Sequence, residues 1–233
     1  MKTLLSKGTT NAKTAKNILE THILYMSPYN QNSKGINICP KASEGCIMGC
    51  LFTAGRGAFN SIQQARKNRT ELYLSNRQLF CEMLANELTA LNKKAQKQGA
   101  KIAVRLNGTS DLDLIAIINK NVGIDILNDF EHLEFYDYTK VLGKVEKYAG
   151  TRYKLTFSRA EDNEAEAVKA LSYGVPVSVV FHHKNELPKT YLGTMVIDGD
   201  KADDLMLDSG AVILGLKAKG KAKKDKTGFV VMA

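Results

Sequence analysis

The sequence predicts an α/β fold with mostly parallel strands, in the form of a partial or complete TIM-like barrel. Two observations predict it. Short apolar runs alternate along the chain with segments of helical periodicity, and several of these runs are apolar on successive residues, as in strands buried on both faces. The chain has 233 residues with no internal repeat and no linker, so we expect a single barrel-like domain over residues 1–233.

The first predicted strand is the apolar run 23–26, which ends at Ser27-Pro28. A long glycine-rich loop follows, from about residue 27 to 59, and contains three of the four cysteines. Long loops of this kind inside a compact domain are usually functional. Residues 27–59 are named the cysteine loop below.

Residues 61–98 contain neither Pro nor Gly, and leucines recur there at helical spacing, which predicts one or two amphipathic helices ending at Gly99. Strands and helices then alternate. Six further strands are expected at 101–106, 132–136, 153–157, 176–181, 195–197 and 211–216. Helices are expected between them at about 112–128, 140–149 and 161–173, with Gly174 ending the last one.

Composition narrows the class of protein. Lys and Arg number 33 against 24 Asp and Glu, which gives a net charge of +9. No stretch approaches the roughly 18 apolar residues of a membrane helix, and the first residues lack the apolar core of a signal peptide. We therefore expect a cytoplasmic protein with no membrane partner. In a reducing compartment, clustered cysteines indicate metal binding or catalysis rather than disulfides.

The cysteine loop contains Cys39, Cys46 and Cys50 in a C-x6-C-x3-C pattern. A structural zinc site normally has four protein ligands, whereas a [4Fe–4S] cluster bound by three cysteines leaves one iron open to a substrate or cofactor. Three thiols at the mouth of a barrel favour the cluster. Zinc completed by a histidine, and reduced cysteines without metal, remain alternatives. Cys81, within a helical segment, is expected to be a core residue.

Polar residues follow nearly every predicted strand, as expected if the carboxyl ends of parallel strands form one ligand-binding mouth. The candidates for binding a cofactor are Asn107, Gly108, Asp111, Tyr136, Lys140, Ser158 and Arg159. The candidates for binding a substrate are Arg105, Asp198, Asp200, Lys217 and Lys219. The two aspartates also suit a divalent cation, although acidic residues between a strand and a helix are more often caps.

A three-cysteine loop after the first strand of an α/β barrel resembles the radical S-adenosylmethionine enzymes, although their usual spacing is C-x3-C-x2-C. The resemblance implies a [4Fe–4S] cluster at the three cysteines and S-adenosylmethionine at its open iron. It also implies that Asn107, Gly108 and Asp111 occupy the strand end that binds the methionine amino group in those enzymes.

Further motifs lie along nearly the whole chain: Cys39-Pro40-x-Ala42-Ser43-x-x-Cys46-x-x-x-Cys50, Arg66-x-x-Arg69, Tyr136-x-Tyr138-Thr139-Lys140, Ser158-Arg159, Val196-Ile197-Asp198-Gly199-Asp200 and Gly215-Leu216-Lys217-Ala218-Lys219-Gly220. In these motifs the chain resembles the phage and plasmid gene-product-88 family. The resemblance implies a protein encoded by a phage or another mobile element, and it implies no particular reaction.

These observations predict an iron–sulfur protein that resembles radical S-adenosylmethionine enzymes and acts on a nucleotide, a nucleic acid or another anionic substrate. Six lysines between residues 217 and 226, in a basic C-terminal tail at about 217–233, suit such a substrate. The main alternative is a non-enzymatic nucleic-acid-binding protein with a structural metal at the cysteines. A third possibility is a hydrolase or transferase with a divalent cation at Asp198 and Asp200.

Overall fold

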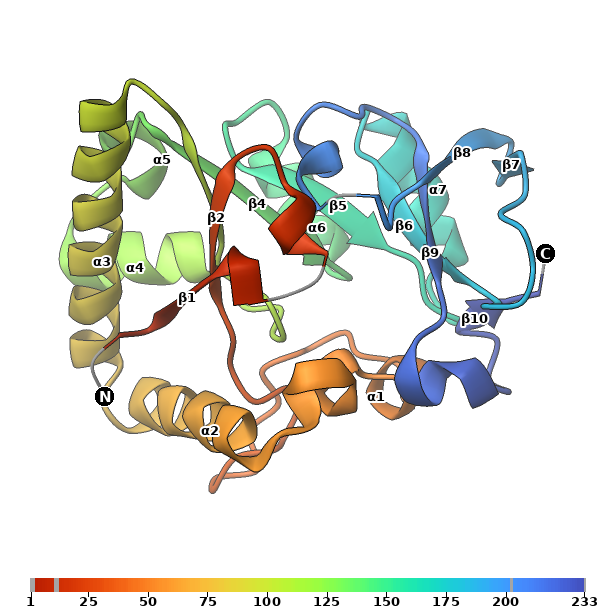
Figure 1. The fold of residues 1–233 in the computed structure, drawn as a ribbon, viewed down its shortest axis with the longest axis horizontal. Coiled ribbons are helices and arrows are strands. Elements are labelled where there is room, and N and C mark those ends of the chain that lie inside the picture. Colours follow the sequence, from red (N-terminus) through yellow and green to blue (C-terminus); the bar gives the residue numbers. More distant parts are fainter. Residues whose placement is uncertain (1–2, 11–12, 202, 233) are drawn as a thin grey trace.

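A computed structural model describes residues 3–10, 13–201 and 203–232. Within these residues, ten strands form one sheet (Figure 1). The strands are β1 (Leu5–Lys7), β2 (Glu20–Leu24), β3 (Ile102–Arg105), β4 (Leu133–Thr139), β5 (Lys154–Ser158), β6 (Val177–Phe181), β7 (Thr190–Tyr191), β8 (Thr194–Asp198), β9 (Ile213–Lys217) and β10 (Val230–Val231).

The pairing order of the sheet is β1-β2-β3-β4-β5-β6-β9-β8-β7, with β10 paired to β6. All pairs along this order from β2 to β8 are parallel. At the two ends, β1 pairs antiparallel with β2, and β7 pairs antiparallel with β8. The prediction of an α/β fold with mostly parallel strands is thus confirmed. The order is open, because no pair within the described residues joins β1 to β7.

All seven predicted strands are present, as β2, β3, β4, β5, β6, β8 and β9. The sequence did not reveal β1, β7 and β10, which are only two or three residues long. It also did not reveal that β9 lies between β6 and β8. Pairing order depends on contacts across the sheet rather than on the pattern along the chain.

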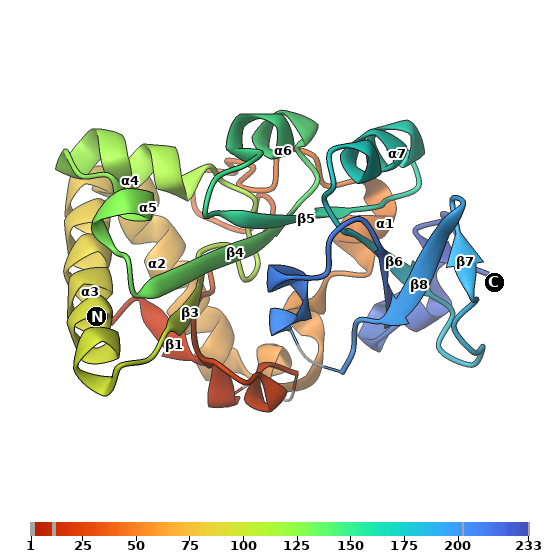
Figure 2. The ribbon, with the colours of Figure 1, turned by 90° about the horizontal axis from the view of Figure 1, so that it is seen from above.

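The helices are α1 (Glu44–Met48), α2 (Asn60–Ser75), α3 (Arg77–Gln98), α4 (Leu114–Val122), α5 (Ile126–Asp129), α6 (Leu142–Tyr148) and α7 (Glu164–Ser172). Figure 2 shows α4, α6 and α7 along one face of the sheet. The short turn η5 (Asp204–Leu207) lies on the opposite face, where Met206 packs against Tyr136 and Leu214.

The long helical segment divides into α2 and α3 at Asn76, which breaks the helix and caps the next one. The Leu79 N–H donates to the Asn76 side chain at 3.1 Å. At the far end, Gly99 has a φ of 59°, a left-handed conformation that favours glycine, and α3 ends directly before it as predicted. Phe80, Leu84 and Leu88 on α3 are fully buried in the largest core cluster.

A buried ion-pair network joins the turn after β8 to the middle of the sheet. The Asp203 carboxylate lies 2.9 Å from Lys13 Nζ and 3.2 Å from Arg105 Nη1. It also accepts hydrogen bonds from the hydroxyl groups of Tyr136 and Tyr138. Burial by itself raises the pKa of Asp203, but the charges of Arg105 and Lys13 together with these hydrogen bonds lower it to about 2.

We expect Asp203→Asn to reduce the free energy of unfolding at pH 7 by about 3 kcal/mol, because it removes the buried carboxylate that pairs with Arg105 and Lys13. The lowered pKa of Asp203 stabilises the native state above the unfolded value of about 3.9, and this contribution is lost as the pH falls toward 2. The difference between wild type and variant should therefore shrink between about pH 4 and pH 2. Urea unfolding at several pH values measures it, with the exposed Asp208→Asn as control. Equal stability of the Asp203 variant and wild type at pH 7 would contradict the network's role.

Candidate functional site

The cysteine loop leaves the carboxyl end of β2 and is held by the loop that follows β3. The Gly108 N–H donates to the Leu24 carbonyl at 2.9 Å, and the Asp111 N–H donates to the Ile38 carbonyl at 3.0 Å. A Cβ at Gly108 would lie 2.7 Å from the ring of Tyr25, so only glycine fits this crossing. The predicted strand end 107–111 therefore forms a wall against the first part of the cysteine loop.

The three cysteines are half-buried and lie on short turns of the loop. Cys39 Sγ accepts a hydrogen bond from the Tyr29 N–H at 3.3 Å and lies 3.7 Å from the Thr109 carbonyl oxygen. Cys46 lies in α1, and Cys50 follows that helix directly and precedes the turn η3 (Leu51–Thr53). The loop thus carries all three thiols within residues 39–50.

Helix α1 is fixed by groups from distant parts of the chain. Glu161, before α7, accepts a hydrogen bond from the Ser43 hydroxyl and one from the Gly45 N–H, both at 2.7 Å. A Cβ at Gly45 would lie 2.2 Å from Thr227 Oγ1 and 2.4 Å from Phe229 Cβ. The C-terminal segment therefore packs directly on the helix that carries Cys46. Figure 1 shows this arrangement, with the blue turn η6 (Gly220–Lys224) beside α1.

The thiols lie close enough to influence one another's charge. Burial, helped by the charges of Cys50, Cys46 and Asp111, raises the pKa of Cys39 to about 12, although the hydrogen bond from the Tyr29 N–H lowers it. Burial also raises the pKa of Cys50, and Cys46 adds to that effect. A metal or cluster that binds these cysteines as thiolates would therefore have to displace the protons of the thiol groups.

Two cations lie beside Cys50 and oppose that rise in its pKa: Arg66, from α2, and Lys140, from the end of β4. The Arg66 side chain lies over the rings of Tyr25 and Phe52, with 4.9 and 5.4 Å between its central carbon and the ring centroids. Arg66 is only 7% exposed, and its Nε and Nη1 have no hydrogen-bond partner within the described residues.

A buried guanidinium with unpaired N–H groups is costly unless an anion accepts them. Within the residues that the structure describes, no group of three or more His, Cys, Asp and Glu side chains is arranged to hold a metal ion as it stands. The site therefore consists of neighbouring thiols with two cations beside them, and it is suited to bind a negatively charged group.

The chain matches the gene product 88 family over residues 3–233. It belongs to this family. No curated protein and no solved structure matches it. No helix among the described residues of this gene product 88 protein is long and apolar enough to span a membrane.

Not all of the predicted site residues lie at the cysteines of this family member. Three of them lie there. Gly108 and Asp111 belong to the 107–111 wall, and the charge of Lys140 acts on Cys50. The Asp111 carboxylate is itself used within the protein, as it pairs with Lys144 Nζ at 2.9 Å and accepts a hydrogen bond from the Lys140 N–H at 2.8 Å.

Asn107, Arg105 and Tyr136 belong to buried hydrogen-bond networks. The Asn107 N–H and side-chain amide donate to Asp137 at 2.8 and 3.2 Å. Arg105 and Tyr136 contact Asp203, as described above. These side chains have protein partners, so their positions are fixed by the fold.

Ser158 bonds to the neighbouring strand β6, while Arg159 holds the C-terminal segment in place. Ser158 Oγ accepts a hydrogen bond from the Ser178 hydroxyl at 3.2 Å. Arg159 donates to the carbonyl oxygens of Gly228 and Phe229, and it lies 3.6 Å from the carboxylate of Glu164. Arg159 therefore acts on the cysteine site indirectly, through the segment that covers α1.

Asp198, Asp200, Lys217 and Lys219 form a separate group at the ends of β8 and β9. The Asp200 N–H donates to Asp198 at 2.9 Å. The Asp200 carboxylate accepts from the Lys217 N–H at 2.9 Å and pairs with Lys219 Nζ at 2.7 Å. Asp200 thus closes the turn that leads into the basic segment.

Sequence reasoning assigned no role to Arg66 and Glu161. Arg66 is part of the Arg66-x-x-Arg69 motif, which was a signal without an interpretation. Glu161 has no local signal at all, because its partners Ser43 and Gly45 are more than a hundred residues away.

An open hollow of about 500 Å³ lies between the start of the cysteine loop and α2. Its lining includes Phe52, which also contacts Arg66, and a series of amide side chains. These amides are Asn30, Gln31, Asn32, Asn60, Gln63 and Gln64. The hollow thus offers both hydrogen-bond donors and hydrogen-bond acceptors next to the site.

The packing on Gly45 can be tested by substitution. We expect Gly45→Ala to lower the free energy of unfolding by about 1–3 kcal/mol through overpacking, and to expose residues 220–232 to proteolysis. Gly143→Ala in α6 is the matched control: nothing lies within 4 Å of its Cβ, so it should be neutral or slightly stabilising. Equal protease resistance of the two variants would show that the segment does not depend on this contact.

Proposed function

We propose that Cys39, Cys46 and Cys50 hold a [4Fe–4S] cluster in a partial α/β barrel, and that S-adenosylmethionine binds at the iron left open. The observation that carries this proposal is buried Arg66, which has unpartnered Nε and Nη1 groups and whose charge acts on Cys50, one of three thiols that influence one another's pKa. A [4Fe–4S] cluster bound by three thiolates would be negatively charged overall, and Arg66 and Lys140 would balance part of that charge.

The chain's own residues would shape this site. The wall 107–111 would position Cys39, since the Thr109 carbonyl and the Ile38–Asp111 hydrogen bond fix that end of the loop. Glu161 and the C-terminal segment would hold α1, and with it Cys46. When bound, the cluster would supply the electron that cleaves S-adenosylmethionine, a step that no side chain performs.

Asn107 and Asp111 would contribute to S-adenosylmethionine binding by fixing the wall, because their own side chains have partners within the protein. Tyr136, Ser158 and Arg159 would also act indirectly, through their bonds to Asp203, to β6 and to the C-terminal segment. Lys140 would contribute directly, since its charge acts on Cys50.

The substrate would be anionic: a nucleotide, a nucleic acid or another acid. Lys217 and the lysines that follow it are exposed and lie on the segment that packs against α1. A gene product of a phage or another mobile element would meet such substrates in its host.

A second candidate is a structural metal in a non-enzymatic nucleic-acid-binding protein. The observation that favours it is the close packing of the C-terminal segment on α1 at Gly45, because a metal at the cysteines would then stabilise the element that supports the lysines.

Metal content distinguishes the two candidates. Protein purified without oxygen should be brown and contain about four iron and four sulfide per chain. Replacing Cys39, Cys46 and Cys50 together by Ala should abolish both, whereas Cys81→Ala, in the buried core, should retain them. Colourless protein with one zinc per chain would support the structural metal instead. An intact cluster that forms no 5′-deoxyadenosine from S-adenosylmethionine under reducing conditions would contradict the radical reaction.

The role of Arg66 gives a separate prediction. Arg66→Gln should make the reduction potential of the cluster more negative and lower its iron content, because a positive charge beside Cys50 is lost. Arg66→Lys should restore part of both. Arg69→Gln is the matched control: Arg69 is also buried and its Nε also lacks a partner within the described residues, but its Nη groups donate to the Tyr25 carbonyl and the Ser6 hydroxyl. Redox titration followed by electron paramagnetic resonance makes the comparison, and equal shifts in the two Gln variants would contradict a specific role.

A further inference from the structure

We propose that single-stranded nucleic acid binds across a surface made by the lysine segment, residues 217–226, and the exposed apolar residues of the cysteine loop. As an assignment of substrate class this rests on the proposed function, since it places the substrate beside the cysteines. The binding itself requires no cluster, so it can be measured separately.

The lysine segment concentrates positive charge. It contains six lysines and a single aspartate, in a chain whose net charge is +9. The lysines are Lys217, Lys219, Lys221, Lys223, Lys224 and Lys226, and all are exposed. The aspartate, Asp225, accepts hydrogen bonds from the N–H groups of Thr227, Gly228 and Val230, so it serves the local turn. Of the six lysines, Lys219 pairs with Asp200.

This charge lies directly beside the cysteine loop. A Cβ at Gly49 would lie 3.1 Å from the Cβ of Ala222, and a Cβ at Gly220 would lie 3.1 Å from that of Ala54. The small residues of the two segments therefore form their contact. Because Ala222 is buried in it while Lys221 and Lys223 on either side are exposed, the turn η6 directs its charges outward.

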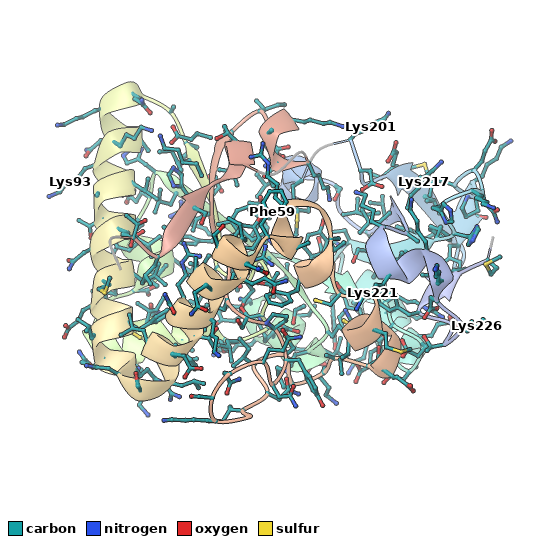
Figure 3. All side chains as sticks on the ribbon, turned by 60° about the horizontal axis from the view of Figure 1, so that its bottom comes forward. Phe59, Lys93, Lys201, Lys217, Lys221 and Lys226 are labelled. Carbon is teal, nitrogen blue, oxygen red and sulfur yellow. The ribbon has the colours of Figure 1, made fainter. Side chains whose placement is uncertain are left out.

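The neighbouring part of the cysteine loop exposes large apolar side chains. Phe59 is 61% exposed, Leu51 is 57% exposed and Met48 is 49% exposed. Phe59 directly precedes α2, a few residues after the turn that contacts η6. Figure 3 shows Phe59 near the middle of the view, with Lys217, Lys221 and Lys226 on one side of it and Lys93, on α3, on the other.

A single strand fits this combination better than a duplex does. Its phosphates would pair with the lysines, and its unstacked bases would cover Phe59 and Leu51. In single-strand-binding grooves, bases stack on aromatic side chains in this way. A duplex presents phosphates but hides the faces of its bases, so the apolar residues would remain in water. A strand following this surface would run past the loop that carries Cys46 and Cys50.

Fluorescence anisotropy of labelled oligonucleotides tests the inference. Single-stranded DNA and RNA of roughly 20 nucleotides, longer than a typical single-strand site, are compared with a duplex of the same sequence and with anionic phospholipid vesicles. The single strands should bind tightest, with affinity falling steeply as salt rises. The DNA and RNA arms show which of the two is preferred.

Two matched pairs of variants locate the surface. Lys221→Glu with Lys223→Glu should weaken single-strand binding by about tenfold or more and reduce its salt dependence. Lys93→Glu with Lys97→Glu, exposed on α3, should change it little. Phe59→Ala should weaken binding to single strands about tenfold, the size expected for one stacked base, without changing binding to duplex. Val168→Ala, half-exposed on α7, is its control.

Absence of binding at low salt would overturn the inference. So would equal affinity for duplex, tighter binding to vesicles, or equal losses in the α3 and lysine-segment variants. Iron content is measured on the same samples. A cluster without single-strand binding would refute only this surface, and single-strand binding without a cluster would refute only the iron–sulfur proposal.

Discussion

The cysteine loop has little regular structure of its own, so its shape depends on the two sides that hold it. On one side, the N–H groups of the 107–111 wall donate to β2 and to Ile38. On the other, Glu161 and the C-terminal segment fix α1. The positions of the three thiols follow from these contacts rather than from the loop's own sequence, and the candidate site could not form in an isolated peptide.

Buried arginines of this chain have different surroundings, and the contrast indicates where a ligand is needed. Arg105 lies between Asp137 and Asp203, and its charge is balanced by the protein. Arg66 is more deeply buried than Arg105, and two of its nitrogens have no hydrogen-bond partner within the described residues. Arg105 therefore stabilises the fold through its carboxylate partners, whereas Arg66 favours the binding of an anion.

The seven longer strands were predictable because each is a short apolar run bounded by turn residues. The position of β9 between β6 and β8 was not, since it depends on contacts across the sheet. The cysteines were found from spacing alone. A polar residue at a strand end does not reveal whether its side chain faces a ligand or another part of the protein. For that reason the sequence predicted ligand contacts for both Arg105 and Lys140, although Arg105 pairs with Asp203. The role of Asp203 had no local signal, because its partners come from β3, β4 and the N-terminal region.

The docking of residues 220–231 on α1 also has a consequence for the order of events during biosynthesis. Cys39, Cys46 and Cys50 leave the ribosome long before Thr227 and Phe229, which pack against Gly45. Until those residues emerge, the thiols lack one of their two supports and are open to the surroundings. A group that binds the thiols could therefore reach them before Val230 and Val231 pair with β6.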